Sequence, residues 1–174
     1  MSTEVVTGVF TLLGAVIGAI AALVPGIYLA LRQEAVAKKS IAYQLYAEIA
    51  AVLRIETRRG YLQSVERMVE HMQANPGVRH SYMVSVQDVP FRVYNTNLSA
   101  IGHLPPDLQR DIVRLYQWME SIVQDIKPGG VANSEPAGLE VYWELLTMLR
   151  EARTLAEQVL DRLEEEFPGL VGAR

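Results

Sequence analysis

The residues that could carry acid–base or metal chemistry are few, and their spacing is poor. The three histidines are His71, His80 and His103, and no HxxxH, HExxH or paired carboxylate–histidine pattern accompanies them. Metal ligands and general bases need partners at fixed positions, so we interpret these residues as surface or loop histidines. Glu66 and Glu70 precede His71 in the sequence, but this grouping is too weak to define a site.

Other catalytic signatures are also missing from the sequence. There is no GxSxG nucleophile elbow and no GxxxxGK[ST] phosphate loop. Cysteine is absent, which excludes disulfides, iron–sulfur clusters, thiolate zinc sites and cysteine nucleophiles. We therefore predict no catalytic residue, no cofactor and no metal site, and expect a protein that is not an enzyme.

The charge balance argues against a nucleic-acid partner. The 16 Lys and Arg residues are outnumbered by 20 Asp and Glu residues, which gives a formal charge of -4. A nucleic-acid-binding protein usually presents a basic face, and the basic residues here are scattered.

The elements that must organise this chain begin with one apolar run, Val5 to Leu31, which contains no charged side chain. As a helix it would be about 40 Å long, whereas the hydrocarbon core of a bilayer is roughly 30 Å thick. The head of the chain lacks the Lys or Arg of a signal peptide, although Ala19-Ile20-Ala21 resembles a cleavage site. We predict a transmembrane segment at residues 1–32 and one cytoplasmic helical domain at residues 33–174.

Charged residues beside the run predict its orientation. Arg32, Lys38 and Lys39 follow the run and only Glu4 precedes it, so the C-terminal domain should be cytoplasmic and the N-terminus outside. Tyr28 and the three basic residues are the predicted membrane-interface residues. They are ordinary topology determinants, and binding of anionic lipid head groups is the alternative.

Small residues recur every fourth position within the run, at Gly14, Gly18, Ala22 and Gly26. This extends the GxxxG pattern, in which missing side chains let two membrane helices approach closely. We interpret the stripe as a homo-oligomerisation surface. The alternative is that Gly and Ala are simply common in membrane helices.

The region after the run reads as a small helical bundle, so the expected fold class is all-α. Residues 33–74 lack proline and predict a long helix, with a bend at Gly60. If no break follows Pro25-Gly26, the transmembrane helix continues directly into it. Asn75-Pro76-Gly77 should stop the helix, and His80 to Val86 should be an extended loop.

Three further helices are expected. A short one runs from about Pro90 to Ile101, and a helix that begins at Pro105-Pro106 carries the first of two apolar seams. Lys127-Pro128-Gly129-Gly130 ends it, and Pro168-Gly169 ends the last helix. The first seam consists of Leu108, Ile112, Leu115, Met119, Ile122 and Ile126, and the second of Tyr142, Leu145, Leu149, Ala152, Ala156, Val159 and Leu163.

Trp118 and Trp143 lie beside these seams, and we interpret both as core residues, with an exposed partner surface as the alternative. Arg153, Arg162 and the charged residues from Asp161 to Glu166 read as a solvated face. An acidic surface for a basic partner is the alternative there.

The segment from Phe91 to Met119 contains a "Y-x-x-N-x-x-x-I-G-x-L-P" stretch followed by "I-V-x-x-Y". It resembles uncharacterised bacterial single-pass membrane proteins in which an apolar N-terminal helix precedes a helical domain. This resemblance implies a bacterial inner-membrane protein and brings no catalytic residues. The matching residues are Tyr94, Asn97, Ile101, Gly102, Leu104, Pro105, Ile112, Val113 and Tyr116.

Gly102 and the proline pair predict a tight corner between two helices, where Asn97 can hydrogen-bond the backbone. The same corner is the candidate partner or ligand site, with Tyr94, Asn97, His103 and Tyr116 as its residues.

These features together predict a membrane-anchored sensor or effector whose partners are the lipid bilayer, other copies of itself, and a cytoplasmic protein or small-molecule trigger. Perturbation or permeabilisation of the membrane is the hypothesised output. The alternative is an anchor or adaptor that recruits a cytoplasmic partner.

Overall fold

The computed structural model describes residues 3–82, 84, 90–133 and 136–170, with the side chains of 3–17 and 19–24 left out. Within these ranges the chain contains six helices and no strand, as the all-α prediction requires. It divides into two units, Met1–Lys39 and Ser40–Arg174. The helices are α1 (Thr3–Arg59), α2 (Tyr61–Ala74), α3 (Arg92–Thr96), α4 (Leu98–Ile101), α5 (Pro106–Ile126) and α6 (Leu139–Glu166).

Unit 1 consists of the first part of α1, and Pro25 lies inside that helix without ending it. Over the residues that the structure describes, no helix has a stretch both long enough and apolar enough to cross a bilayer. Most residues of the predicted span, including Gly14 and Ala22, lie outside the set whose surroundings are described.

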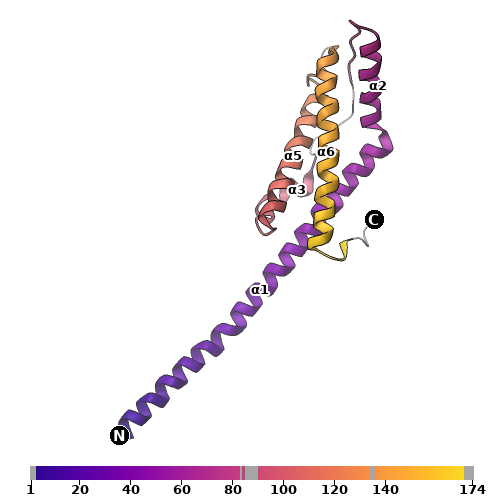
Figure 1. Ribbon diagram of the computed structural model, residues 1–174. Helices are drawn as coiled ribbons and strands as arrows, with labels where there is room; N and C mark the ends of the chain where they lie inside the picture. The colour runs from indigo at the N-terminus through magenta and orange to yellow at the C-terminus, as the bar shows by residue number, and fades with distance from the viewer. Residues whose placement is uncertain (1–2, 83, 85–89, 134–135, 171–174) are drawn as a thin grey trace. The chain divides into compact units, whose positions relative to one another are not determined.

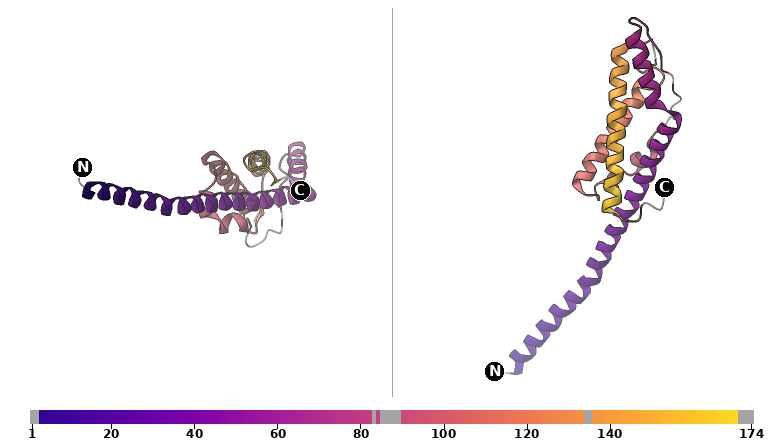
Figure 2. Two further views of the ribbon diagram at one scale, coloured as in Figure 1. Left: turned by 90° about the horizontal axis from the view of Figure 1, so that it is seen from below. Right: turned by 45° about the vertical axis from the view of Figure 1, so that its right-hand side comes forward.

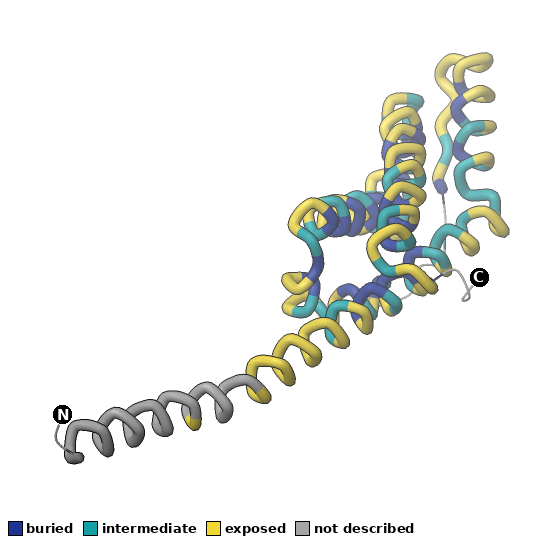
Figure 3. The backbone as a smooth tube through the Cα atoms, turned by 60° about the horizontal axis from the view of Figure 1, so that its bottom comes forward, coloured by how far each residue is buried: buried dark blue, intermediate teal, exposed yellow. Residues whose placement is uncertain are grey.

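Unit 2 is a helical bundle in which α6 lies beside both α5 and α2, as Figure 1 and the two views of Figure 2 show. The predicted seams of α5 and α6 account for this packing, because almost all of their residues are buried. Figure 3 shows buried and exposed positions alternating along the helices of unit 2.

Two clusters of buried side chains form the core of unit 2. The first joins the end of α1, from Ile41 to Ile49, to α3, α4, α5 and the second half of α6. The second joins α2 to the first half of α6 and includes Tyr82, Ala132 and Ala137 from the connecting segments. Burial of apolar surface in these clusters is the main stabilising contribution.

The bend predicted at Gly60 is a full break between α1 and α2. Gly60 has a φ of +63°, a left-handed conformation that costs glycine far less than other residues. Asn75 ends α2, where the stop was expected.

The single helix predicted for residues 90–101 is instead two short helices, α3 and α4, which meet at Asn97. The loop predicted from His80 has no helix over its described residues, and His80 forms an isolated antiparallel bridge with Ala137. Residues 83, 85 and 86 of that loop lie outside the described residues.

The turn after α5 depends on Gly130. A Cβ atom at this position would collide with the backbone carbonyl groups of Gln124 and Asp125 in the last turns of α5. The close approach lets Ala132 N donate to Asp125 O at 3.0 Å and Asn133 Nδ2 donate to Ile126 O at 3.0 Å, which satisfies carbonyl groups near the C-terminus of α5.

Gly130→Ala should therefore destabilise unit 2 by about 2 kcal/mol, because backbone atoms must shift to admit the methyl group. Gly138→Ala is the matched control, since a Cβ there meets nothing within 4 Å. Denaturant unfolding of both full-length variants would measure the difference, and equal stabilities would contradict this account of the turn.

Candidate functional site

The predicted corner is held together by one carboxylate that the sequence analysis did not identify. Glu48 lies on α1, and its Oε1 accepts a hydrogen bond from Val93 N at 2.8 Å while its Oε2 accepts one from Tyr94 N at 3.0 Å. The hydroxyl of Tyr116 donates a third hydrogen bond to Oε2 at 2.8 Å. Glu48 thus connects α1 to the start of α3 and to the middle of α5.

This arrangement supplies the N-terminal cap that α3 lacks. The residue before α3 is Phe91, which has no side-chain oxygen to accept the first amide hydrogens of the helix. Phe91 is also held at φ 56° and ψ 48°, a left-handed conformation that is unfavourable for a bulky residue. Its ring packs edge-on against Tyr116 at 5.5 Å, so tertiary packing stabilises the turn.

Tyr94 and Tyr116, both predicted corner residues, stack on each other. Their ring centroids are 3.8 Å apart with an interplanar angle of 8°. Burial raises the pKa of the Tyr116 hydroxyl, and the adjacent negative charge and hydrogen bond of Glu48 raise it further. Burial and the charge of Glu120 also raise the pKa of Tyr94. Both phenols therefore stay protonated, and Tyr116 remains a donor to Glu48.

Asn97 forms the hydrogen bond to the backbone that its position predicted. Its Nδ2 donates to Val93 O at 2.8 Å and to Gln44 Oε1 of α1 at 3.3 Å. His103, the fourth predicted residue, is exposed, and no hydrogen bond of its side chain to the described residues is present. The structure thus brings Tyr94, Asn97 and Tyr116 together around α1 and leaves His103 outside the cluster.

The polar groups of the corner are already paired with one another, which favours a structural role. The Glu48 carboxylate already accepts three donors, and the Tyr116 side chain is fully buried. A satisfied carboxylate is a poor general base, because its lone pairs are in use. Among the described residues, no group of three or more His, Asp or Glu side chains could hold a metal ion.

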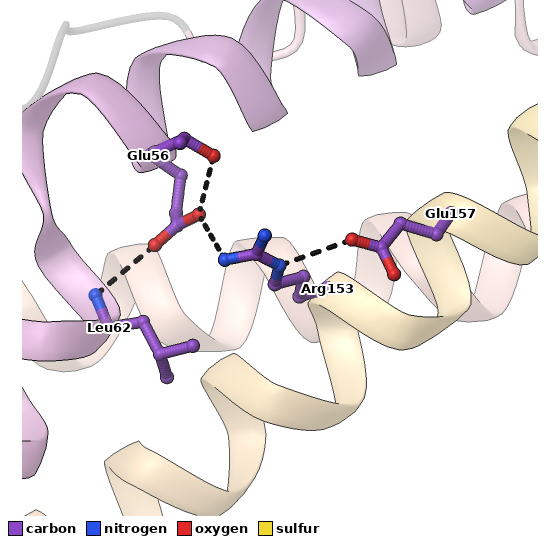
Figure 4. A network of polar contacts seen from close by, with 5 residues as sticks. Glu56, Leu62, Arg153 and Glu157 are labelled. Atoms are coloured by element: carbon purple, nitrogen blue, oxygen red, sulfur yellow. Dashed lines mark hydrogen bonds and ion pairs between the residues drawn. The ribbon is translucent and has the colours of Figure 1, made fainter.

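A second polar network fastens α6 to the break between α1 and α2 (Figure 4). Glu56 accepts from Leu62 N at 3.2 Å and forms an ion pair with Arg153 at 3.4 Å, and Arg153 also pairs with Glu157 at 3.2 Å. Arg162 likewise pairs with Asp111 of α5. The predicted solvated face is confirmed for Asp161, Glu165 and Glu166, which are exposed, but it was wrong for Arg153 and Arg162, since both connect helices.

The two tryptophans differ in their surroundings. Trp118 packs against the second core cluster and is partly buried. Trp143 is 41% exposed on α6, so its interpretation as a core residue was wrong. It follows Tyr142, which takes the inward position of the seam and is completely buried.

The predicted membrane-proximal residues belong to unit 1. Tyr28 and Arg32 are exposed, and Lys38 forms an ion pair with Glu34 at 2.8 Å. Lys39 is also exposed. Gly18 and Gly26 of the predicted stripe face open space, because a Cβ added to either meets nothing within 4 Å.

In comparisons with known proteins, no family model, curated protein or solved structure matches this chain.

A pair of buried tyrosines tests the role of the corner. Tyr116→Phe keeps the stacked ring and removes the donor to Glu48, so it should destabilise unit 2 by about 2 kcal/mol. The hydroxyl of Tyr142 is equally buried and has no hydrogen-bond partner among the described residues, so Tyr142→Phe should leave stability unchanged or raise it by up to about 1 kcal/mol. Denaturant unfolding would give the free energy of unfolding of both variants. A larger loss of stability for Tyr142→Phe than for Tyr116→Phe would contradict the role assigned to the Tyr116–Glu48 hydrogen bond.

Stability should also fall in strongly alkaline solution. Burial, followed by the neighbouring Tyr61 and Tyr142 hydroxyls, raises the pKa of Tyr82 from 10.0 to about 12. The folded state therefore binds this proton more tightly than the unfolded state, so the Tyr82 hydroxyl contributes to the free energy of unfolding. This contribution is complete below pH 10 and is lost as the pH rises from 10 to about 12. Ultraviolet titration of tyrosinate, followed alongside circular dichroism, should show late ionisation coupled to unfolding. Ionisation of all eight tyrosines near pH 10 in the folded state would contradict it.

Proposed function

We propose that this protein is a non-enzymatic sensor or effector of the bacterial inner membrane, anchored by residues 1–32, with unit 2 in the cytoplasm. The observation that carries the anchor is the exposure of Ile27, Tyr28, Leu29 and Leu31 on α1, all more than half exposed. Successive helix residues are about 100° apart, so these side chains spread over about 200° of the helix, and the small apolar residues Gly26 and Ala30 lie on the remaining side. A helix that is apolar on all sides needs an apolar environment, and lipid supplies one.

Self-association of the anchor is the second part of the proposal. Gly18 and Gly26 have open space where a side chain would begin, and their spacing continues the small-residue stripe with Gly14 and Ala22. Membrane helices associate by close packing of such surfaces, because water-driven burial of apolar area is not available between lipid-exposed helices.

The third part is the link between the anchor and the domain. Residues of α1 belong to both units, and its segment from Ile41 to Ile49 contributes to the core of unit 2. A partner or ligand that alters this packing would act on the same helix that enters the membrane. Membrane perturbation is the output that this proposal assigns to the change.

The proposal is tested with Gly18→Leu in the full-length chain. The single chain has room for the new side chain, so the fold of unit 2 should be unaffected and any effect should come from contact with another molecule. We expect the wild-type chain to fractionate with membranes and resist alkaline extraction, and to form oligomers in mild detergent. Gly18→Leu should stay in the membrane fraction and associate roughly tenfold more weakly, equivalent to about 1.4 kcal/mol.

Ile20→Phe is the matched control. It adds bulk two residues further on, about 200° around the helix, so it should leave association intact. Recovery of the wild-type chain in the soluble fraction would overturn the anchor. A membrane-bound chain that is monomeric with and without Gly18→Leu would overturn self-association and favour the adaptor function.

A further inference from the structure

A basic cluster, defined as Arg54, Ile55 and Arg58, lies exposed at the C-terminal end of α1 in unit 2. The two arginines are four residues apart and therefore lie on the same side of the helix, with Ile55 beside them and 52% exposed. Neither arginine forms an ion pair within the part of the chain that the structure describes. Arg153, by contrast, is held between two carboxylates.

An acidic cluster, defined as Glu140, Trp143 and Glu144, lies exposed at the start of α6. Its two carboxylates are also four residues apart, and Trp143 beside them is 41% exposed. The negative charge of Glu144 contributes, after burial, to raising the pKa of Asp125, so a third carboxyl group lies near the cluster. Over the described residues, neither glutamate of the cluster pairs with a basic side chain.

The two clusters match in three respects. Their charges are opposite, their charged residues have the same four-residue spacing, and each carries one large exposed apolar side chain. Arginine forms bidentate hydrogen bonds with carboxylates and stacks on the face of tryptophan, so Trp143 suits a guanidinium as well as an isoleucine. An exposed apolar residue flanked by charges is typical of an interface core with a polar rim.

We propose that the basic cluster of one copy of this chain docks on the acidic cluster of a second copy. The two surfaces differ, so the contact is head-to-tail, and each copy retains one free cluster for a further neighbour. Contacts of this kind produce rings when the rotation closes and open chains when it does not. The contact lies in unit 2 and adds to the self-association of the anchor proposed above without depending on it.

Single cysteines test the contact directly, because the chain contains none of its own. Differently tagged full-length chains carry Ala51→Cys and Thr147→Cys, at exposed positions one helical turn from Ile55 and Trp143, so both clusters stay intact. They are mixed in mild detergent and treated with a short bismaleimide. We expect a cross-linked heterodimer between them. Val113→Cys on α5, which is also exposed, replaces either partner as the control and should give little product. Failure of the first pair to exceed this control would overturn the proposal.

Charge reversal provides an independent test. Arg54→Glu with Arg58→Glu, and separately Glu140→Lys with Glu144→Lys, should each weaken the cross-link by at least about tenfold, because like charges then face each other. Mixing the two charge-reversed chains should restore the cross-link, since the basic cluster of one again meets the acidic cluster of the other. Retention of the cross-link in either variant alone, or its absence from the mixture, would contradict the proposal.

The cysteine pair is also placed in the Gly18→Leu background, which separates this contact from packing of the anchor. Persistence of the cross-link there is expected, whereas its loss would show that the contact between clusters depends on the membrane helix and would overturn its independence.

Discussion

The arrangement of unit 2 depends on one carboxylate, that of Glu48. It satisfies two backbone amides at the start of α3 and the Tyr116 hydroxyl of α5, and it reaches them from α1. The carboxylate accepts three hydrogen bonds, so its removal would leave three donors unpaired in a partly buried place. The desolvation of these unpaired donors would destabilise unit 2 by more than the loss of the hydrogen bonds themselves. The position of the α3–α4 corner on α1 therefore depends on Glu48 as well as on apolar contacts, because α3 is only five residues long and Tyr94 is its one buried residue.

The sequence predicted those features that depend on neighbouring residues. Helix periodicity identified the buried faces of α5 and α6, and proline and glycine located their ends, because these signals act within a few residues. Glu48 could not be found in this way, since Val93 and Tyr94 lie 45 and 46 residues further along the chain. Arg153 was misread for the same reason: its partner Glu56 lies 97 residues away, and in sequence the pair reads as two solvated charges.

The packing of the corner explains the "Y-x-x-N-x-x-x-I-G-x-L-P" stretch of the sequence. Tyr94 stacks on Tyr116, Asn97 closes the end of α3, and Ile101 and Leu104 are buried in the first core cluster. Each of these residues is used to hold the corner on α1. A sequence pattern of this kind therefore reports the fold of the domain, whereas the contact that we propose between copies lies on exposed surfaces of unit 2.

The charges of unit 2 support that distinction. Arg150, Arg153 and Arg162 on α6 each pair with a carboxylate of another helix, so their charges are used within the chain. Arg54 and Arg58 are exposed and have no such pairing among the described residues, and the same holds for Glu140 and Glu144. Exposed pairs contribute little to the stability of one chain, so charges that remain unpaired cost the fold almost nothing. They can instead determine which surfaces meet when two chains associate, where complementary charge governs orientation and specificity.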